Sequence, residues 1–164
     1  AIPFKPHIIK NGAEVKAVDY DLGINGVAYL DTDTADYHIS NGKHGGNRGR
    51  VYRNDGVDIT TDPAAADNYI VNHTAAGEWL QYTLNVIQGG HYKVKVTYNA
   101  EKENGAISLY VNNSNTKKVT VPKGSNWQAL EIKDVELKKG PNTLRIYIDS
   151  GEMNLRSLQF TAVQ

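Results

Sequence analysis

The sequence predicts an all-β protein, a β-sandwich formed by a single domain. Tight-turn dipeptides recur along the chain, with Asn-Gly at 11–12, 25–26, 41–42 and 104–105, Asp-Gly at 55–56 and Gly-Gly at 89–90. Such dipeptides supply the positive φ that short turns need. Short segments in which apolar and polar residues alternate lie between them, as in antiparallel sandwiches. No segment of useful length has the helical period.

The predicted strands follow one another from residue 77 onward. In GEWLQYTLNV (77–86), four apolar residues alternate with Gln, Thr and Asn, which is the pattern of a half-buried strand. Four further strands have the apolar faces Tyr92, Val94, Val96 and Tyr98; Ile107, Leu109 and Val111; Leu144, Ile146 and Ile148; and Leu155, Leu158, Phe160 and Ala162. The change of phase between Leu155 and Leu158 indicates a β-bulge. The polar run 31–68 has few strand signals and is expected to be a functional or self-packed loop.

Length and composition restrict the class of protein. The 164 residues suit one domain over 1–164, in which 1–11 form a linker or an edge segment. Eighteen basic residues balance eighteen acidic ones, so the basic excess of a nucleic-acid-binding protein is missing. There is no long apolar run for a membrane span and no cysteine for a disulfide or a thiolate. The start lacks an initiator Met and a signal-peptide pattern, which we interpret as a segment cut from a longer chain.

Both tryptophans fall on the polar phase of their segments. Trp79 precedes the core-phase residue Leu80, and Trp127 is out of phase with Leu130 and Ile132. We therefore expect exposed indole faces, unless a bulge shifts the phase and buries them. A flat aromatic face among amides suits a pyranose ring, whose C–H groups stack while its edge is hydrogen-bonded. The aromatic cage of a quaternary ammonium site and the flanking cations of a base-stacking site are not evident.

The sequence resembles family 6 carbohydrate-binding modules over nearly its whole length. The residues that carry the resemblance are, in order, VKAVDYDLGINGVAYLDTD, YRNDGVDI, YIVNHTAAGEWLQYTLNV, GGHYKVKVTYNA, NWQALEIKDVELKKGPNTLRI and EMNLRSLQF. The resemblance implies a jelly-roll sandwich without catalysis of its own. It implies attachment to a catalytic domain in a secreted, cell-surface or periplasmic enzyme. The implied ligand is an oligo- or polysaccharide of the β-glucan, xylan, laminarin or agar type.

The resemblance also implies where sugar binds. In the cleft among the loops, Trp127 and the residue at position 73 correspond to two aromatic walls, and Asn154 corresponds to a hydrogen-bonding amide. His73 departs from the usual Tyr or Trp, which reduces the stacking area but adds a donor or acceptor. Asn72 is expected to contribute a further contact. A second site on the concave face of one sheet corresponds to Trp79, with Gln81 in the same phase.

Calcium is a second departure from the family pattern. The positions that usually hold a structural ion correspond to Lys16, Val18 and Arg156, whose side chains offer no oxygen ligand. We therefore expect that calcium site to be lost. The run DTD at 31–33, together with Asp36 or Asp58, offers oxygen donors for another possible ion site. This second set stays open, because acidic residues in loops commonly serve as turn formers.

Three rival functions remain. A glycosidase needs two carboxylates beside the scissile bond, for which the candidates are Asp31, Asp33, Asp58 and Glu78. The five histidines have no zinc-site spacing. A protein-interaction or adhesion module is the alternative from another class, because fold does not settle function. Tyr52 and Arg53 are interpreted as structural, with Arg53 holding the long loop through hydrogen bonds to carbonyl groups.

Overall fold

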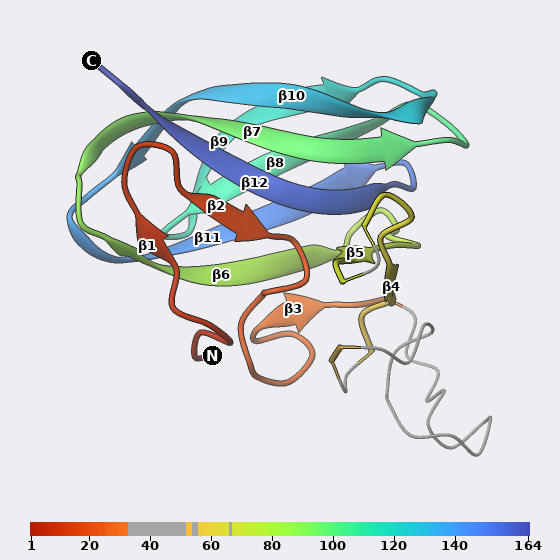
Figure 1. Cartoon of the computed structure of the whole chain (residues 1–164), viewed down its shortest axis with the longest axis horizontal. Helices are drawn as coiled ribbons and strands as arrows, with labels where there is room; N and C mark the ends of the chain where they lie inside the picture. Colours follow the sequence, from red (N-terminus) through yellow and green to blue (C-terminus); the bar gives the residue numbers. More distant parts are fainter. Residues whose placement is uncertain (33–51, 54–55, 66) are drawn as a thin grey trace.

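The computed structural model describes residues 1–32, 52–53, 56–65 and 67–164, and shows two six-stranded sheets packed face to face (Figure 1). The first sheet contains β1 (Ile8–Ile9), β3 (Tyr29–Leu30), β6 (Trp79–Val86), β8 (Gly105–Val111), β9 (Ser114–Val121) and β11 (Gly140–Ser150). The second sheet contains β2 (Glu14–Lys16), β4 (Ile59–Thr61), β5 (Tyr69–Val71), β7 (Gly90–Ala100), β10 (Gly124–Leu137) and β12 (Asn154–Val163). Most of the predicted loop 31–68 lies outside the described residues.

The chain crosses repeatedly between the two sheets. The first sheet has the order β1-β6-β11-β8-β9, with β3 also paired to β6. The second has the order β10-β7-β12-β5-β4, with β2 also paired to β12. Neighbours in a sheet are therefore mostly distant in sequence, as in a jelly roll. The predicted all-β sandwich of jelly-roll type is confirmed. Among the described residues, no helix has the length and apolar character needed to cross a bilayer.

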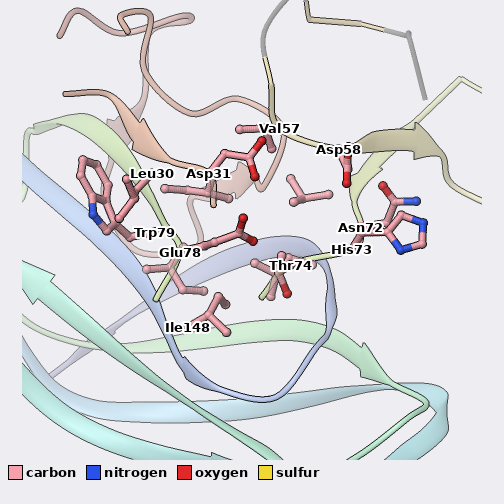
Figure 2. A pocket seen from close by; sticks show the side chains of 14 residues that line it. Leu30, Asp31, Val57, Asp58, Asn72, His73, Thr74, Glu78, Trp79 and Ile148 are labelled. Carbon is pink, nitrogen blue, oxygen red and sulfur yellow. The ribbon is translucent and has the colours of Figure 1, made fainter. Parts of the chain in front are cut away.

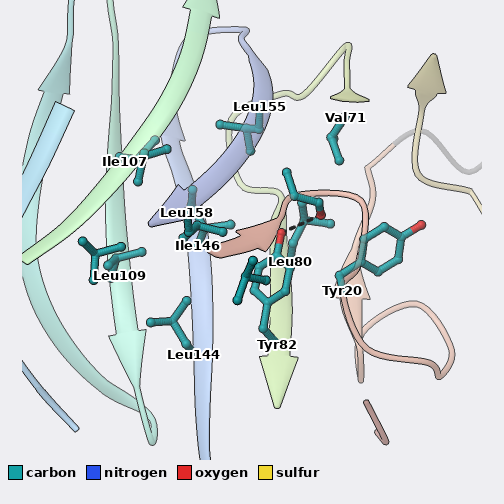
Figure 3. Packing of buried hydrophobic residues seen from close by; sticks show 14 of the residues in the cluster. Tyr20, Val71, Leu80, Tyr82, Ile107, Leu109, Leu144, Ile146, Leu155 and Leu158 are labelled. Carbon is teal, nitrogen blue, oxygen red and sulfur yellow. Dashed lines mark hydrogen bonds between the residues drawn. The ribbon is translucent and has the colours of Figure 1, made fainter. Parts of the chain in front are cut away.

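The core consists of the predicted apolar faces of both sheets (Figure 3). Tyr82, Leu144 and Leu158 are fully or almost fully buried, and each such side chain contributes about 1.5–3 kcal/mol on burial. The Tyr82 hydroxyl donates to the Ala17 carbonyl at 2.7 Å, which satisfies the one polar atom that this ring brings into the core. Alternation alone was sufficient to predict these faces.

The predicted β-bulge in β12 is present. Leu155 pairs with Tyr98 of β7, whereas the next pair is Ser157 with Thr97. Arg156 is therefore the extra residue that no partner in β7 opposes. The bulge keeps Leu155 and Leu158 in the core and places the Arg156 side chain outside it.

Arg53 anchors the N-terminal half of the chain. Its guanidinium lies between two aromatic rings, 4.0 Å from Phe4 and 3.9 Å from Tyr20. It donates to the carbonyls of Val18, Tyr20 and Asp21 at 2.6–3.0 Å. A planar fork of donors satisfies three carbonyls at once, which an ammonium group cannot do in the same geometry. The structural role expected for Arg53 is visible in these contacts.

Candidate functional site

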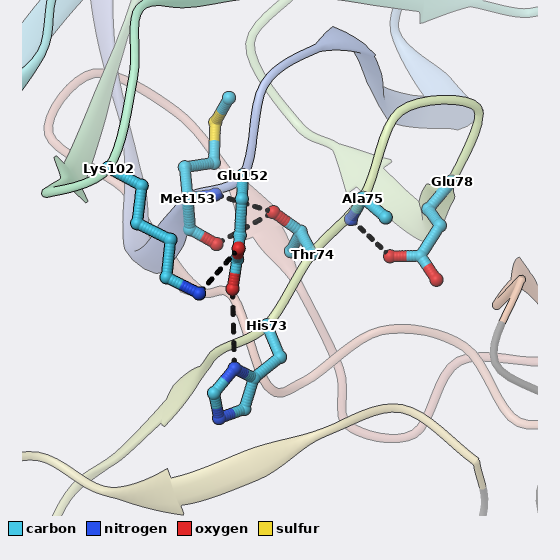
Figure 4. Close-up of polar contacts among 7 residues, drawn as sticks. All are labelled: His73, Thr74, Ala75, Glu78, Lys102, Glu152 and Met153. Carbon is cyan, nitrogen blue, oxygen red and sulfur yellow. Dashed lines mark hydrogen bonds and ion pairs between the residues drawn. The ribbon is translucent and has the colours of Figure 1, made fainter.

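The segment that follows β5 is fastened to the residue that precedes β12. Val71 pairs with Leu155. Beyond this pair, Thr74 donates to the Met153 carbonyl from its backbone nitrogen at 3.4 Å and from its hydroxyl at 2.6 Å. The Met153 backbone nitrogen donates back to the Thr74 hydroxyl at 3.0 Å (Figure 4). These contacts fix two chain segments that are distant in sequence at one end of the sandwich.

Three residues assigned to sugar binding lie at this end. Asn72 and His73 directly precede Thr74, and Asn154 directly follows Met153. The φ of His73 is +53°, a left-handed conformation that a residue other than glycine adopts when its surroundings hold it there. His73 is exposed, whereas Asn72 and Asn154 are partly buried. The structure thus gathers one imidazole and two amides at the same loop end.

A charged pair orients the imidazole. His73 Nδ1 lies 3.3 Å from Glu152 Oε1, and Lys102 Nζ donates to Glu152 Oε2 at 2.9 Å (Figure 4). The hydrogen bond from Lys102 lowers the pKa of Glu152; burial opposes this effect and His73 adds to it. Glu152 is therefore an ionised acceptor that holds the edge of the imidazole ring. Nearly half of the His73 side chain (46%) stays exposed beside it.

An open cleft of about 620 Å³ lies beside these residues. Its described lining consists of Thr32, Asp58, His73, Thr74, Ala75, Ala76, Glu78, Lys102, Glu103, Gly151 and Glu152. The volume falls within the range of small-molecule sites, and the lining is mostly polar. Such a cleft suits a hydroxyl-rich ligand better than an apolar one.

A second, narrow pocket adjoins the cleft (Figure 2). Its volume of about 20 Å³ holds a water molecule but no sugar ring. Glu78 lies between the two spaces, and its carboxylate accepts from the backbone nitrogens of Ala75 at 2.6 Å and Thr32 at 2.8 Å. These bonds make Glu78 a carboxylate that fixes a turn. The rival assignment of a catalytic role to Glu78 gains no support from its contacts.

Trp127 lies on the second sheet, which also contains β5 and β12. It is partly exposed on β10, where the register with β7 shifts between Gly124 and Gln128. The Arg156 guanidinium lies 4.0 Å from the centre of its ring. In the sheet order, β7 and β12 separate β10 from β5, which leads into His73. Of the described residues that line the cleft, none comes from β10. The two expected aromatic walls are therefore on separate strands and do not face each other across the cleft.

Asn99 connects the segment that carries Trp127 with Asn154, and the sequence pattern does not identify it as a residue of the site. It lies directly opposite Asn154 in the register of β7 and β12. Its Nδ2 donates to the Ser125 carbonyl, two residues before Trp127. Asn99 is 3% exposed, and its Oδ1 has no partner among the described residues. The sequence places it on the outer phase of β7, but alternation does not reveal that the residue is covered.

Trp79 and Gln81 require a correction. Trp79 lies outside the core cluster, as its phase predicts, but the predicted exposure is wrong: the residue is only 6% exposed. Arg145 of β11 lays its guanidinium 3.8 Å from the Trp79 ring and donates from Nε to Gln81 Oε1 at 2.8 Å. Gln81 is 8% exposed and donates to Asp21. The long side chain of the neighbouring strand covers both residues, so neither offers a free surface to a second ligand.

Lys16 and Arg156, which stand where the family pattern has calcium ligands, make hydrogen bonds within the protein. Lys16 Nζ donates to Asn68 Oδ1 at 2.7 Å, and Arg156 donates to both oxygens of Asp62 at 2.7 and 2.8 Å. Asp62 and Asn68 are joined by a backbone hydrogen bond in the β4–β5 hairpin. Two cations thus hold the hairpin against β2 and β12. Of the alternative ion set, Asp33 and Asp36 lie outside the described residues, and the described residues contain no group of three or more metal ligands.

The family model that matches the sequence is the carbohydrate binding module of family 35, over residues 53–160. No curated protein matches the chain. The resemblance to family 6 is confirmed at the level of the fold, because solved modules of families 6 and 35 both match this structure.

Three solved structures illustrate the similarity. The module CBM6cm-2 from Cellvibrio mixtus lichenase 5A, in complex with cellotriose, has a TM-score of 0.58 and 18% identity, covering 66% of this chain and 88% of its own. The C-terminal family 6 module of LamC, a marine laminarinase from Zobellia galactanivorans, has a TM-score of 0.64 and 16% identity over 92% and 99%. A family 35 module from an environmental isolate has a TM-score of 0.58 and 21% identity over 65% and 83%.

Proposed function

The chain belongs to family 35 of the carbohydrate-binding modules, and from that premise we propose that it carries a secreted glycoside hydrolase to its polysaccharide. The module itself is non-catalytic, and the catalytic domain is part of the same parent chain. The ligand is a polysaccharide of the β-glucan, xylan, laminarin or agar type. The names of similar modules support this reading, because they come from a lichenase and a laminarinase.

One observation carries the choice of site. The pairing of β5 with β12 brings Asn72 and His73 close to Asn154 at one end of the sandwich. Of these three, His73 is among the described residues that line the open cleft, whereas Asn72 lines the narrow pocket and its Oδ1 is buried. The amide of Asn154 supplies a donor and an acceptor for the edge of a sugar ring, and the exposed imidazole supplies a small flat face. Trp127 supplies a larger flat face farther along the same sheet.

The arrangement of the strands indicates the length of the ligand. Trp127 is on β10 and His73 follows β5, and β7 and β12 lie between these two strands. We therefore place an oligosaccharide across the strand ends, from Trp127 past Asn154 to His73, in place of one ring clamped between two aromatics.

Affinity gel electrophoresis tests the function directly. Gels containing β-1,3/1,4-glucan, xylan, laminarin or agar are run with the wild type and with Trp127→Ala, Asn154→Ala and Asn85→Ala. Asn85 is exposed on β6 in the other sheet and serves as the matched control. We expect at least one gel to retard the wild type and Asn85→Ala, with weaker retardation of the other two variants. Incubation with the same polysaccharides is expected to release no reducing sugar.

Three results would contradict the proposal in different ways. A wild type that no gel retards would exclude these ligand classes. Retardation that persists equally in Trp127→Ala and Asn154→Ala, with unchanged melting curves, would exclude the loop-end site. Release of reducing sugar over hours would restore the glycosidase alternative.

A further inference from the structure

Arg156 occupies one face of the Trp127 indole. The guanidinium carbon lies 4.0 Å from the ring centre, which is a stacking distance. Arg156 is the bulged residue of β12, so it has no partner in β7, and its side chain lies outside the core. The contact leaves Trp127 a single face on which a ligand can stack.

Asp62 fixes the guanidinium in this position. It accepts from Arg156 Nε at 2.7 Å and from Nη2 at 2.8 Å, and the Ala64 backbone nitrogen donates to it at 2.9 Å. The Asp62 side chain is 3% exposed, so its carboxylate is shielded from water, while the Arg156 side chain is 27% exposed. A bidentate, shielded fork holds the guanidinium plane in one orientation. The indole is consequently stacked on a rigid support.

The backbone that carries the indole is held independently. Asn99 donates to the Ser125 carbonyl, within the segment where the register of β10 shifts. The ring and the chain of Trp127 therefore have separate anchors on β12 and β7. A platform built in this way needs little further ordering when a ligand binds.

We propose that the Asp62–Arg156 pair positions Trp127 as a platform on which a sugar ring of the polysaccharide stacks, and that the affinity of the module depends on this support. The inference rests on the proposed loop-end site. Arg156 covers one face of the indole, so a sugar ring on Trp127 stacks on the opposite face. Arg156 acts through Trp127 and is a positioning residue.

The first experiment establishes the ligand. Whichever of the four polysaccharides retards the wild type most is chosen, and its dissociation constant is measured by isothermal titration calorimetry.

The second experiment tests the positioning role with a matched control. Arg156→Gln removes the support of Trp127, whereas Arg145→Gln removes the equivalent guanidinium from buried Trp79. We expect the dissociation constant for the chosen polysaccharide to rise about threefold to tenfold in Arg156→Gln, because an unsupported indole must be ordered on binding. It is expected to stay unchanged in Arg145→Gln. The double variant Asp62→Asn/Arg156→Gln, which avoids a buried unpaired carboxylate, is expected to show the same loss.

Fluorescence provides a readout that does not need a ligand. In proteins that also carry Trp79→Phe, Trp127 is the sole tryptophan. Acrylamide is expected to quench it more strongly after Arg156→Gln, since both faces of the ring are then accessible. Unchanged quenching and unchanged affinity would overturn the positioning role. If Trp127→Ala weakens binding but Arg156→Gln does not, only the further inference fails; if Trp127→Ala has no effect, the proposed site itself fails.

Discussion

Asn99 donates a hydrogen bond to the carbonyl of Ser125 and thereby ties the end of β7 to the irregular start of β10. On its other side, β7 pairs with β12, and there Asn99 pairs with Asn154. It therefore lies between the segment that carries the Trp127 platform and the amide assigned to the sugar. Its own acceptor, Oδ1, is buried without a partner among the described residues.

Asn99→Asp tests this bond with almost no change of shape. A carboxylate cannot donate to the Ser125 carbonyl, and its charge is buried at a residue that is 3% exposed. We expect the free energy of unfolding to fall by about 1–3 kcal/mol and polysaccharide binding to weaken. Urea unfolding and calorimetric titration measure the two effects. Equal stability and affinity in variant and wild type would show that Asn99 holds nothing of importance.

Chelation is expected to leave the protein's stability unchanged. Lys16 and Arg156 place cationic groups, paired to Asn68 and Asp62, at the positions where the family resemblance implies calcium ligands. A tightly bound ion at 100 to 1,000 times its dissociation constant would stabilise the fold by about 3–4 kcal/mol, which a melting curve registers readily. Melting curves with EDTA and with added calcium are therefore expected to superimpose. A marked fall with EDTA would reveal an ion site that involves other residues.

Acidification is expected to destabilise the fold through Asp62. Burial, the largest single influence, raises the pKa of Asp62, but the Arg156 hydrogen bonds and charge and the Ala64 hydrogen bond together lower it below the ordinary value of 3.8. The folded state then binds protons less readily than the unfolded state. The resulting stability is fully present above about pH 4 and is lost as pH falls through the folded pKa. Asp62→Asn is expected to be less stable near neutral pH and to show a flatter dependence below pH 4; identical curves would contradict this account.

The alternation in the sequence predicts the fold but does not predict which residues are exposed on the outer faces of the sheets. The reason is physical. Inward positions such as Tyr82 and Leu144 obey alternation because the other sheet always covers them. Outward positions depend on which neighbouring side chain crosses the strand. Trp79 has the predicted phase, yet Arg145 from β11 covers it. This contact depends on the register between β6 and β11, which no pattern within either strand reveals.

The candidate site likewise contains residues that the sequence identifies and contacts that only the structure reveals. Asn72, His73 and Asn154 were identified through the resemblance, and the pairing of β5 with β12 brings them to one end. The sequence does not reveal the supporting role of Arg156, because the family resemblance implies only that this position lacks a calcium ligand. The bulge next to Leu155 was predicted, but the direction that it gives to Arg156 requires the positions of Asp62 and Trp127.

Arg53 is expected to be among the least replaceable residues of the described chain. It is 6% exposed, stacks between two rings and satisfies three backbone carbonyls. Arg53→Lys keeps the charge but loses the planar fork, so buried carbonyls are left without donors. We expect a loss of about 2–4 kcal/mol in the free energy of unfolding, from hydrogen bonds that involve a charged group. A variant that unfolds at the urea concentration of the wild type would show that the carbonyls find other donors.

His73→Tyr is expected to tighten polysaccharide binding. His73 stands where the family resemblance implies a larger aromatic, and its side chain is 46% exposed beside the open cleft. The backbone already holds this residue at φ +53°, so the substitution introduces no new left-handed position. The phenol ring enlarges the stacking face, and an aromatic contact contributes about 0.5–1.5 kcal/mol beyond area burial, or roughly twofold to tenfold in affinity. Glu152 loses its imidazole partner in this variant but keeps the hydrogen bond from Lys102, so its carboxylate charge stays paired.

Calorimetric titration of wild type, His73→Tyr and His73→Ala is expected to rank the affinities in the order Tyr, His, Ala. Weaker binding by the tyrosine variant with an unchanged melting curve would mean that the sugar uses the imidazole nitrogens, and that the small polar ring is itself the specificity element of this wall.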